Sequence, residues 1–288
     1  MTTRKTAVIT GGRSEVARWA AIALARAGAR VVLVSSSASA AVARDEIVKR
    51  SGSHDVHLLL ADLSLMSSVR ELGRQLLENW HSISAVIHHG AYHNLRAAKR
   101  DVTADGFERF WAHNQLGPFL LTHLLRDPLI KGHGRVITVG STRLKVYPRL
   151  TVDPSDPNFE DRSFSATRAF YQSKLAQIQF ALALQRHWHT AAVVAKSVCV
   201  PSVGSDTVRR TALPWHRRIA HQVTAKGTLH TPRKIGELYA VLALSSATAR
   251  LAPVYVDRNL QAAWAPRAAF DEAQQDAVWM ASVKALGL

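Results

Sequence analysis

The chain has little cysteine and no long apolar run. Cys199 is the single cysteine, which excludes an internal disulfide framework and suits a reducing compartment. No stretch reaches the roughly 20 apolar residues that are needed to cross a membrane. The N-terminus passes through Arg4 and Lys5 directly into an apolar strand pattern, without the apolar core of a signal peptide. We therefore expect a soluble, cytoplasmic protein with no membrane partner.

Acidic residues are also scarce. Asp and Glu number 21 against 37 Lys and Arg, which gives a formal net charge of +16. The helical segments carry no basic stripe with interleaved aromatic residues, so we expect no nucleic-acid partner. Two explanations stay open: a solvated basic surface, or a basic rim that attracts anionic ligands. The basic residues are densest from Pro201 to Gly236, where the one acid Asp206 stands among Arg209, Arg210, Arg217, Arg218, Lys226, Arg233 and Lys234.

Short Val- and Ile-rich runs alternate along the chain with longer amphipathic segments. This alternation is typical of a parallel sheet with helical crossovers. We predict an α/β fold: a single doubly wound domain over residues 1–288, with a parallel seven-stranded sheet and helices on both faces. Residues 201–232 are predicted to form a substrate-binding flap within it. The predicted strands are residues 7–10, 30–34, 56–61, 85–88, 135–139, 193–200 and 253–256, and the predicted helices are 14–27, 40–50, 66–80, 106–125, 166–188 and 235–244.

Several motifs together resemble the short-chain dehydrogenase/reductase family, and within it the retinol dehydrogenase-like branch. The resemblance spans nearly the whole chain, and it implies a Rossmann-type fold that binds a nicotinamide dinucleotide. It also implies a small-molecule substrate, and a homo-oligomer is possible through the helices before and after the catalytic segment. The segments that carry it are residues 105–108, 114–122, 135–141, 173–176 and 254–257, followed by a helix containing Trp279.

The glycine-rich turn after the first strand departs from the family pattern Thr-Gly-x-x-x-Gly-x-Gly. Gly11 keeps the first glycine, whereas Glu15 and Ala17 replace the second and third. The second glycine lets the backbone approach a pyrophosphate at the helix N-terminus. A carboxylate ~5 Å from a phosphate charge costs about 3 kcal/mol at an effective dielectric of about 20. Either Glu15 takes the place of the phosphates, or it turns to solvent and a tilted dinucleotide still binds.

The second strand runs into three serines, among them Ser36, which can hydrogen-bond a ribose but cannot pair with a phosphate charge. Arg13 supplies such a charge, so NADP is preferred over NAD if a dinucleotide binds. Asp62 and Leu63 match the adenine-contacting pair of the family. We therefore expect either no cofactor or weakly bound NADP.

Where the family has Asn-Asn-Ala-Gly, this chain has His88, His89 and Gly90, with His93 nearby. Consecutive strand residues point to opposite faces, so the two adjacent imidazoles do not easily share an ion, and we predict no metal site. One imidazole, His88 in our assignment, is a candidate acid–base group. Two hydrogen-bonded structural histidines are the alternative.

The family's catalytic tetrad of Asn, Ser, Tyr and Lys is retained here as Asn114, Ser141 and Lys174, but Phe170 occupies the tyrosine position. By resemblance, the serine hydrogen-bonds the substrate carbonyl, the lysine binds the nicotinamide ribose, and the asparagine orders a water. A phenyl ring cannot exchange a proton. Tyr171 is a candidate replacement, although one residue rotates a helix by about 100°.

Three functions stay open. The first is a non-redox enzyme that catalyses a cyclisation, isomerisation, aldol-type or pericyclic step on a natural-product intermediate, anionic or carrier-bound. The second is an NADP-dependent alcohol or ketone oxidoreductase in which Tyr171 or a histidine donates the proton. The third is a non-catalytic binding partner whose basic segment docks an acidic protein such as an acyl carrier.

Overall fold

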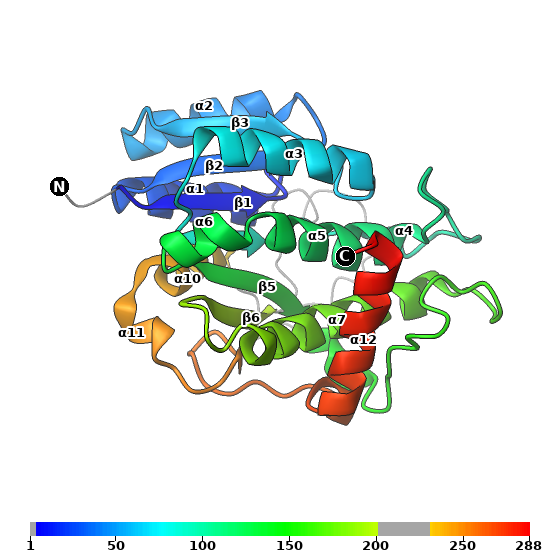
Figure 1. Cartoon of the computed structure of the whole chain (residues 1–288). Coiled ribbons are helices and arrows are strands. Elements are labelled where there is room, and N and C mark those ends of the chain that lie inside the picture. Colours follow the sequence, from blue (N-terminus) through cyan, green and yellow to red (C-terminus); the bar gives the residue numbers. More distant parts are fainter. Residues whose placement is uncertain (1–3, 201–230) are drawn as a thin grey trace, which may run out of the picture.

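The computed structural model describes residues 4–200 and 231–288 (Figure 1). Seven parallel strands form one sheet in the order β3-β2-β1-β4-β5-β6-β7. The predicted Rossmann-type fold with a parallel seven-stranded sheet and helices on both faces is confirmed. The strands are β1 Thr6–Thr10, β2 Arg30–Ser35, β3 Val56–Leu60, β4 Ala85–His88, β5 Arg135–Ser141, β6 Val194–Val200 and β7 Tyr255–Val256.

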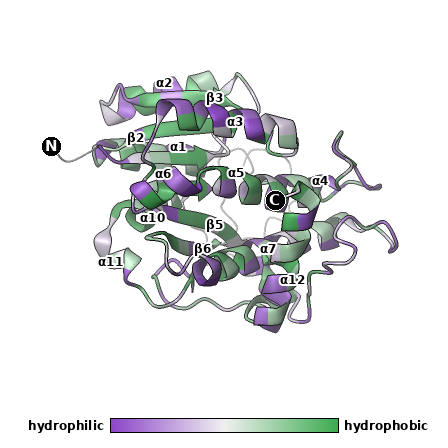
Figure 2. Ribbon diagram, in the orientation of Figure 1, coloured by the Kyte–Doolittle hydropathy of each residue, from purple (hydrophilic) through white to green (hydrophobic). Residues whose placement is uncertain are grey.

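Both faces of the sheet are buried, because successive side chains of each strand enter two different cores. In β1, Val8 packs into one core, whereas Ala7 and Ile9 pack into the other. Figure 2 shows the strands mainly in hydrophobic colours, whereas the helices carry hydrophilic residues as well. One core takes side chains from α1 (Glu15–Arg26), α2 (Ala40–Ser51) and α10 (Pro232–Leu244), and the other from α3 (Met66–Asn79), α5 (Gly117–Leu124), α6 (Arg126–Lys131), α7 (Ala166–His187) and α12 (Glu272–Leu286).

The single helix predicted over residues 106–125 is wrong. The chain forms a short α4 (Arg109–Trp111), then a π-helical turn (Ala112–Leu116), and only then α5, with α6 as a further helix. The wider turn is held by contacts from elsewhere, since Gln177 of α7 donates a hydrogen bond to the carbonyl oxygen of Asn114. π-helical turns inside helices often mark functional sites.

The ends of other elements differ from the prediction by a few residues. Strand β5 continues to Ser141, β7 has only two residues, and α10 begins at Pro232, where the side chain of Thr231 caps it. The remaining short elements are α11 (Ser246–Ala249) and the 3-10 turns Thr142–Val146 and Arg267–Ala269.

The C-terminal helix α12 crosses α7 on the outside of the molecule (Figure 1). Trp279 of α12 packs against Phe119 of α5 and Phe180 of α7, with ring centroids 4.8 and 6.1 Å apart. Pairing of copies was expected through the helices before and after the catalytic segment. The oligomeric state stays a prediction.

The predicted flap and the basic segment fall mostly in residues that the structure does not describe. Residues 201–230, which hold most of the proposed flap and of the basic segment, lie outside the described residues, so the flap and its docking role stay predictions. Among the residues that are described, no helix combines the length and the apolar character needed to span a bilayer.

Candidate functional site

A cavity of about 450 Å³ lies at the carboxyl ends of the parallel strands. Ligands of open α/β sheets bind at this edge, where the strand order reverses. Here the reversal falls between β1 and β4. The lining comes from the ends of six strands and from α7: Thr10, Gly11, Arg13, Ser14, Val34, Ser35, Ser36, Ala61, Leu63, His89, Gly90, Ala91, His113, Val139, Gly140, Ser141, Phe170, Lys174 and Val200. This set contains Arg and Lys but no Asp, Glu or Tyr.

The floor of the cavity depends on a close approach between the ends of β1 and β4. Gly11 has φ +82°, and a Cβ atom there would lie 2.8 Å from the Cα of Gly90. Thr10 closes the same contact, because its hydroxyl accepts a hydrogen bond from the backbone N–H of Gly90 at 3.0 Å. The first glycine of the motif therefore keeps both its conformation and its close approach.

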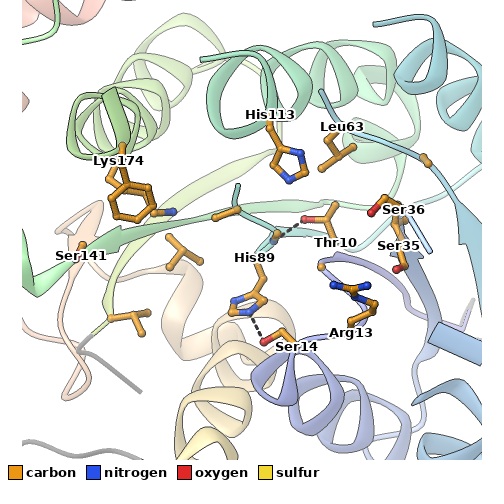
Figure 3. A pocket seen from close by; sticks show the side chains of 18 of the residues that line it. Thr10, Arg13, Ser14, Ser35, Ser36, Leu63, His89, His113, Ser141 and Lys174 are labelled. Atoms are coloured by element: carbon orange, nitrogen blue, oxygen red, sulfur yellow. Dashed lines mark hydrogen bonds between the residues drawn. The ribbon is translucent and has the colours of Figure 1, made fainter. Parts of the chain in front are cut away.

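One end of the cavity, the β2 end, is formed by Arg13, Ser35, Ser36 and Leu63. In Figure 3 Arg13 lies on the same side of the pocket as Ser35, which ends β2, and Ser36, which follows it. Leu63 lines the cavity, whereas Asp62 does not. Asp62 instead accepts hydrogen bonds from the backbone and hydroxyl of Ser64 and faces His113 at 3.8 Å, which together hold its pKa below the usual range.

Glu15 is the first residue of α1, yet it is absent from the cavity lining. The adjacent Ser14 faces the cavity and caps the helix, since its hydroxyl accepts a hydrogen bond from Val16 N at 3.2 Å. Within residues 4–200 and 231–288, no ion pair holds the Glu15 carboxylate elsewhere. Glu15 thus lies beside the helix N-terminus without filling the cavity.

The two adjacent histidines point to opposite faces of the sheet. His88 is buried against α5, where its Nε2 lies 2.8 Å from the hydroxyl of Thr122, and burial lowers its pKa to about 3. His89 faces the cavity and bridges the hydroxyls of Ser14, at 2.8 Å, and Tyr239, at 3.2 Å (Figure 3). The structure therefore places His89, rather than His88, in the site.

Burial lowers the pKa of His89 to about 4, and the positive charge of Lys174 contributes to the shift. The ring is therefore neutral near pH 7, so one nitrogen donates a hydrogen bond and the other accepts one. Its two hydroxyl partners already use both nitrogens. His89 is better suited to fix the floor of the cavity than to exchange protons.

The other end of the cavity, the α7 end, is formed by Ser141, Phe170 and Lys174. Ser141 ends β5, and its hydroxyl accepts a hydrogen bond from Arg143 N at 3.2 Å, which leaves its own proton available. Phe170 and Lys174 lie one turn apart on α7, so both face the cavity. Burial lowers the pKa of Lys174 to about 8.

The structure does not bring Tyr171 or Asn114 into the cavity lining. The ring of Tyr171 packs on Tyr147 at 4.8 Å, as expected for a residue rotated away from the Phe170 face. The Asn114 amide is fully buried and bonded to the backbone of Tyr92 and the hydroxyl of Ser173. The amide of Asn114 therefore bonds to other parts of the protein and lies outside the described lining of the cavity.

Two further histidines lie near the site, His113, which the sequence did not single out, and His93, which it placed near the histidine pair. His113 lines the cavity on the same side as Leu63 (Figure 3), and no sequence signal marks it, because the π-helical turn decides where it points. His93 packs its ring edge-on against Phe170 at 4.7 Å, and desolvation followed by the charges of Lys174 and Arg143 lowers its pKa.

The described residues fit a dinucleotide at the β2 end. Arg13 offers a charge for a 2′-phosphate, Ser35 and Ser36 offer hydroxyls, and the Gly11–Gly90 contact leaves room beside the N-terminus of α1. At the α7 end, Lys174 can hold a ribose. A bound nicotinamide would supply a hydride, but no tyrosine hydroxyl is present in the described lining to supply the accompanying proton.

A doubly wound sheet with such a cavity at its switch point defines a dinucleotide-binding class of fold. The family model for short chain dehydrogenases matches residues 5–151. The chain belongs to the short-chain dehydrogenase family.

Named relatives agree with this membership. Human retinol dehydrogenase 13 is 27% identical over 294 residues, which cover 99% of this chain and 85% of that protein. A protein of Streptomyces sp. (strain C5), named for daunorubicin C-13 ketoreduction, is 34% identical over 186 residues, which cover 64% of this chain and 61% of that protein. The crystal structure of an uncharacterized Mycobacterium paratuberculosis protein shares the fold, with a TM-score of 0.72, 23% identity and coverage of 98% and 93% of the two chains.

Proposed function

We propose that this chain is a non-redox enzyme that performs enolate chemistry, such as an isomerisation, cyclisation or aldol-type step, on a small carbonyl compound. The observation that carries the proposal is the phenyl ring of Phe170 in the cavity wall, one helical turn before Lys174. A reduction needs a proton donor at this point. An enolisation needs a base and a hydrogen-bond donor, and both are present.

Each polar group at the α7 end has a role in this chemistry. The hydroxyl of Ser141 donates a hydrogen bond to the substrate carbonyl oxygen and stabilises the negative charge that develops there. The amine of Lys174 removes a proton from the carbon next to the carbonyl, since a pKa of about 8 leaves part of it uncharged near neutral pH. The ammonium then returns the proton at another carbon, or a new carbon–carbon bond forms. Phe170 keeps water away from the amine.

A natural-product intermediate is the proposed substrate class. The support is the ketone substrate in the name of the Streptomyces relative, which is 34% identical over the part that aligns. Ketones of that kind have acidic C–H bonds next to the carbonyl, which is what a lysine base requires.

Deuterium exchange tests the proposal without knowledge of the natural substrate. Acetoacetate esters and cyclic ketones are incubated with the protein in D₂O and followed by NMR. We expect protein-dependent exchange at the α-carbon, and a loss of about a hundredfold in Ser141→Ala, as is typical when an oxyanion donor is removed. Absence of exchange, together with stoichiometric oxidation of NADPH by a ketone, would overturn the proposal.

A second function has one observation in its favour. Arg13, Ser35 and Ser36 lie together at the β2 end, where an NADP 2′-phosphate would bind, and Glu15 is not in the lining. An NADP-dependent ketone reductase would then use His93 or Lys174 to donate the proton. Fluorescence titration with NADPH separates the two functions. Tight binding and ketone-dependent loss of NADPH absorbance favour the reductase, whereas weak binding with deuterium exchange favours the enolate enzyme.

A further inference from the structure

The amine of Lys174 opens onto the cavity from a residue that is otherwise almost completely buried. The residue is 5% exposed, and within the described part of the chain its Nζ makes no hydrogen bond and no ion pair. Its Nζ keeps accessible surface, since it is not one of the fully buried side-chain atoms that lack a hydrogen-bond partner. A cavity is the one direction left to this amine, because Lys174 lines it (Figure 3).

A second buried lysine shows that the fold can satisfy such a group. Lys196 in β6 is 3% exposed, and its Nζ donates hydrogen bonds to the carbonyl oxygens of Leu251, at 2.6 Å, and Pro253, at 2.9 Å. Lys174 has no comparable acceptors. The contrast indicates that the Lys174 amine is left open for a ligand.

The surroundings of Lys174 favour the uncharged amine. Phe170 is apolar, and desolvation is what lowers the pKa of Lys174, while the positive charge of Lys174 in turn lowers the pKa of His89 and His93. With a pKa of about 8, about one tenth of the side chain is free amine at pH 7, against roughly one part in three thousand for an ordinary lysine. Lysines desolvated in this way are the ones that react as nucleophiles.

We propose that Lys174 is a covalent catalyst that forms an imine with the carbonyl carbon of an aldehyde or ketone substrate. This inference rests on the proposed function, since it uses the same cavity and the same class of substrate. In the proposed function Lys174 only transfers a proton, whereas here it also forms a carbon–nitrogen bond with the substrate.

The step balances without any further reactant. The nitrogen lone pair of Lys174 attacks the carbonyl carbon, a C–N bond forms, and the C=O electron pair moves to oxygen, which Ser141 holds by a hydrogen bond. Two protons of the original ammonium leave with that oxygen as water, and the third stays on the protonated imine. Charge is conserved, and nothing is oxidised or reduced. The protonated imine draws electrons from the neighbouring C–H bond, and hydrolysis later returns the lysine and a carbonyl product.

Reductive trapping tests the imine on the intact protein. The wild type is incubated with acetaldehyde or cyclohexanone and sodium cyanoborohydride at pH 7, and the modified lysines are mapped by peptide mass spectrometry. We expect Lys174 to be alkylated at least about tenfold faster than any other lysine, because its free-amine fraction is larger. Lys196, buried but bonded, serves as the internal control and is expected to stay unmodified.

Lys174→Arg keeps the positive charge and removes the nucleophile, so it is expected to abolish the fast modification. Labelling spread over exposed lysines, with Lys174 unmodified and the Lys174→Arg variant unchanged in rate, would overturn the inference. Deuterium exchange in the same samples distinguishes the two proposals. If the wild type exchanges deuterium but Lys174 is not alkylated, the imine is overturned and Lys174 remains a base. If the wild type shows neither deuterium exchange nor alkylation of Lys174, the proposed function is overturned as well.

Discussion

In the described lining, each end of the cavity has one basic side chain, and the two side chains differ in their exposure to solvent. At the β2 end, the Arg13 guanidinium is exposed to solvent. At the α7 end, the Lys174 amine is buried beside Phe170 and loses its proton near pH 8. One end is thus suited to attract a phosphate, and the other to do chemistry on a neutral carbonyl.

The largest expected effect lies at the α7 end. The folded-state pKa of Lys174 is about 8 against an ordinary value of 10.5, so keeping it charged lowers the free energy of unfolding by about 3 kcal/mol below pH 8. Lys174→Met is therefore expected to raise the free energy of unfolding by about that amount at pH 7. The gain shrinks between pH 8 and 10.5, where the folded protein no longer carries the proton that the unfolded chain still binds.

Urea unfolding at pH 7 and above pH 10 measures this difference. Lys196→Met is the matched control, and it should lower the free energy of unfolding by about 1–3 kcal/mol, because two buried carbonyl oxygens lose their donor. A loss of stability in Lys174→Met at pH 7 would mean that the amine has a partner.

The pH dependence of the deuterium-exchange rate is a second test of Lys174 at the α7 end. In the proposed reaction Lys174 acts as a free amine, so the rate is expected to rise about tenfold per pH unit up to about pH 8 and then to level off. Phe170→Tyr should move the midpoint upward, since a phenol one turn away stabilises the ammonium. A profile that is flat from pH 6 to 9 would remove Lys174 from the rate-determining step.

A smaller effect is expected at the β2 end. Arg13→Ala should weaken NADPH binding about fivefold, or about 1 kcal/mol, because an exposed ion pair is worth little more. NADH binding should not change, since NADH has no 2′-phosphate. Arg18→Ala, which removes a half-buried arginine of α1 that pairs with Glu46, is the control. Equal loss of NADPH and NADH affinity would contradict this role.

The smallest expected effect belongs to Glu15. Because the carboxylate lies beside the cavity and not in it, we expect Glu15→Gly to tighten NADPH binding by about threefold, well below the cost of a direct contact. Glu15→Gln separates charge from bulk, and it should give most of the gain if repulsion is the cause. Calorimetric titration with NADPH measures the affinity of each variant. Unchanged affinity in both would show that the missing glycine does not limit binding.

The sheet could be predicted from the sequence because its strands are apolar runs buried on both faces. Strand β4, Ala85–His88, was predicted to the residue. The interruption of the helix over residues 106–125 could not be predicted in this way. Its π-helical turn depends on contacts with Tyr92, Ser173 and Gln177, which come from distant parts of the chain.

The site was predictable in part for the same reason. Motif positions located Ser141, Lys174, Arg13 and Leu63, because strand ends and helix faces follow from spacing. The alternation of side chains along a strand predicts that His88 and His89 face opposite sides of the sheet, but it does not predict which of them faces the cavity. That choice depends on which helices cover each face.

The bridge from Tyr239 through His89 to Ser14 has a consequence for handling the protein. Three elements, α10, β4 and α1, are tied together at the cavity floor by side chains of the chain itself. The apoprotein should consequently survive purification with its binding edge already ordered. Any rise in melting temperature on adding a nucleotide or a ketone would then measure occupancy, and not the repair of a collapsed site.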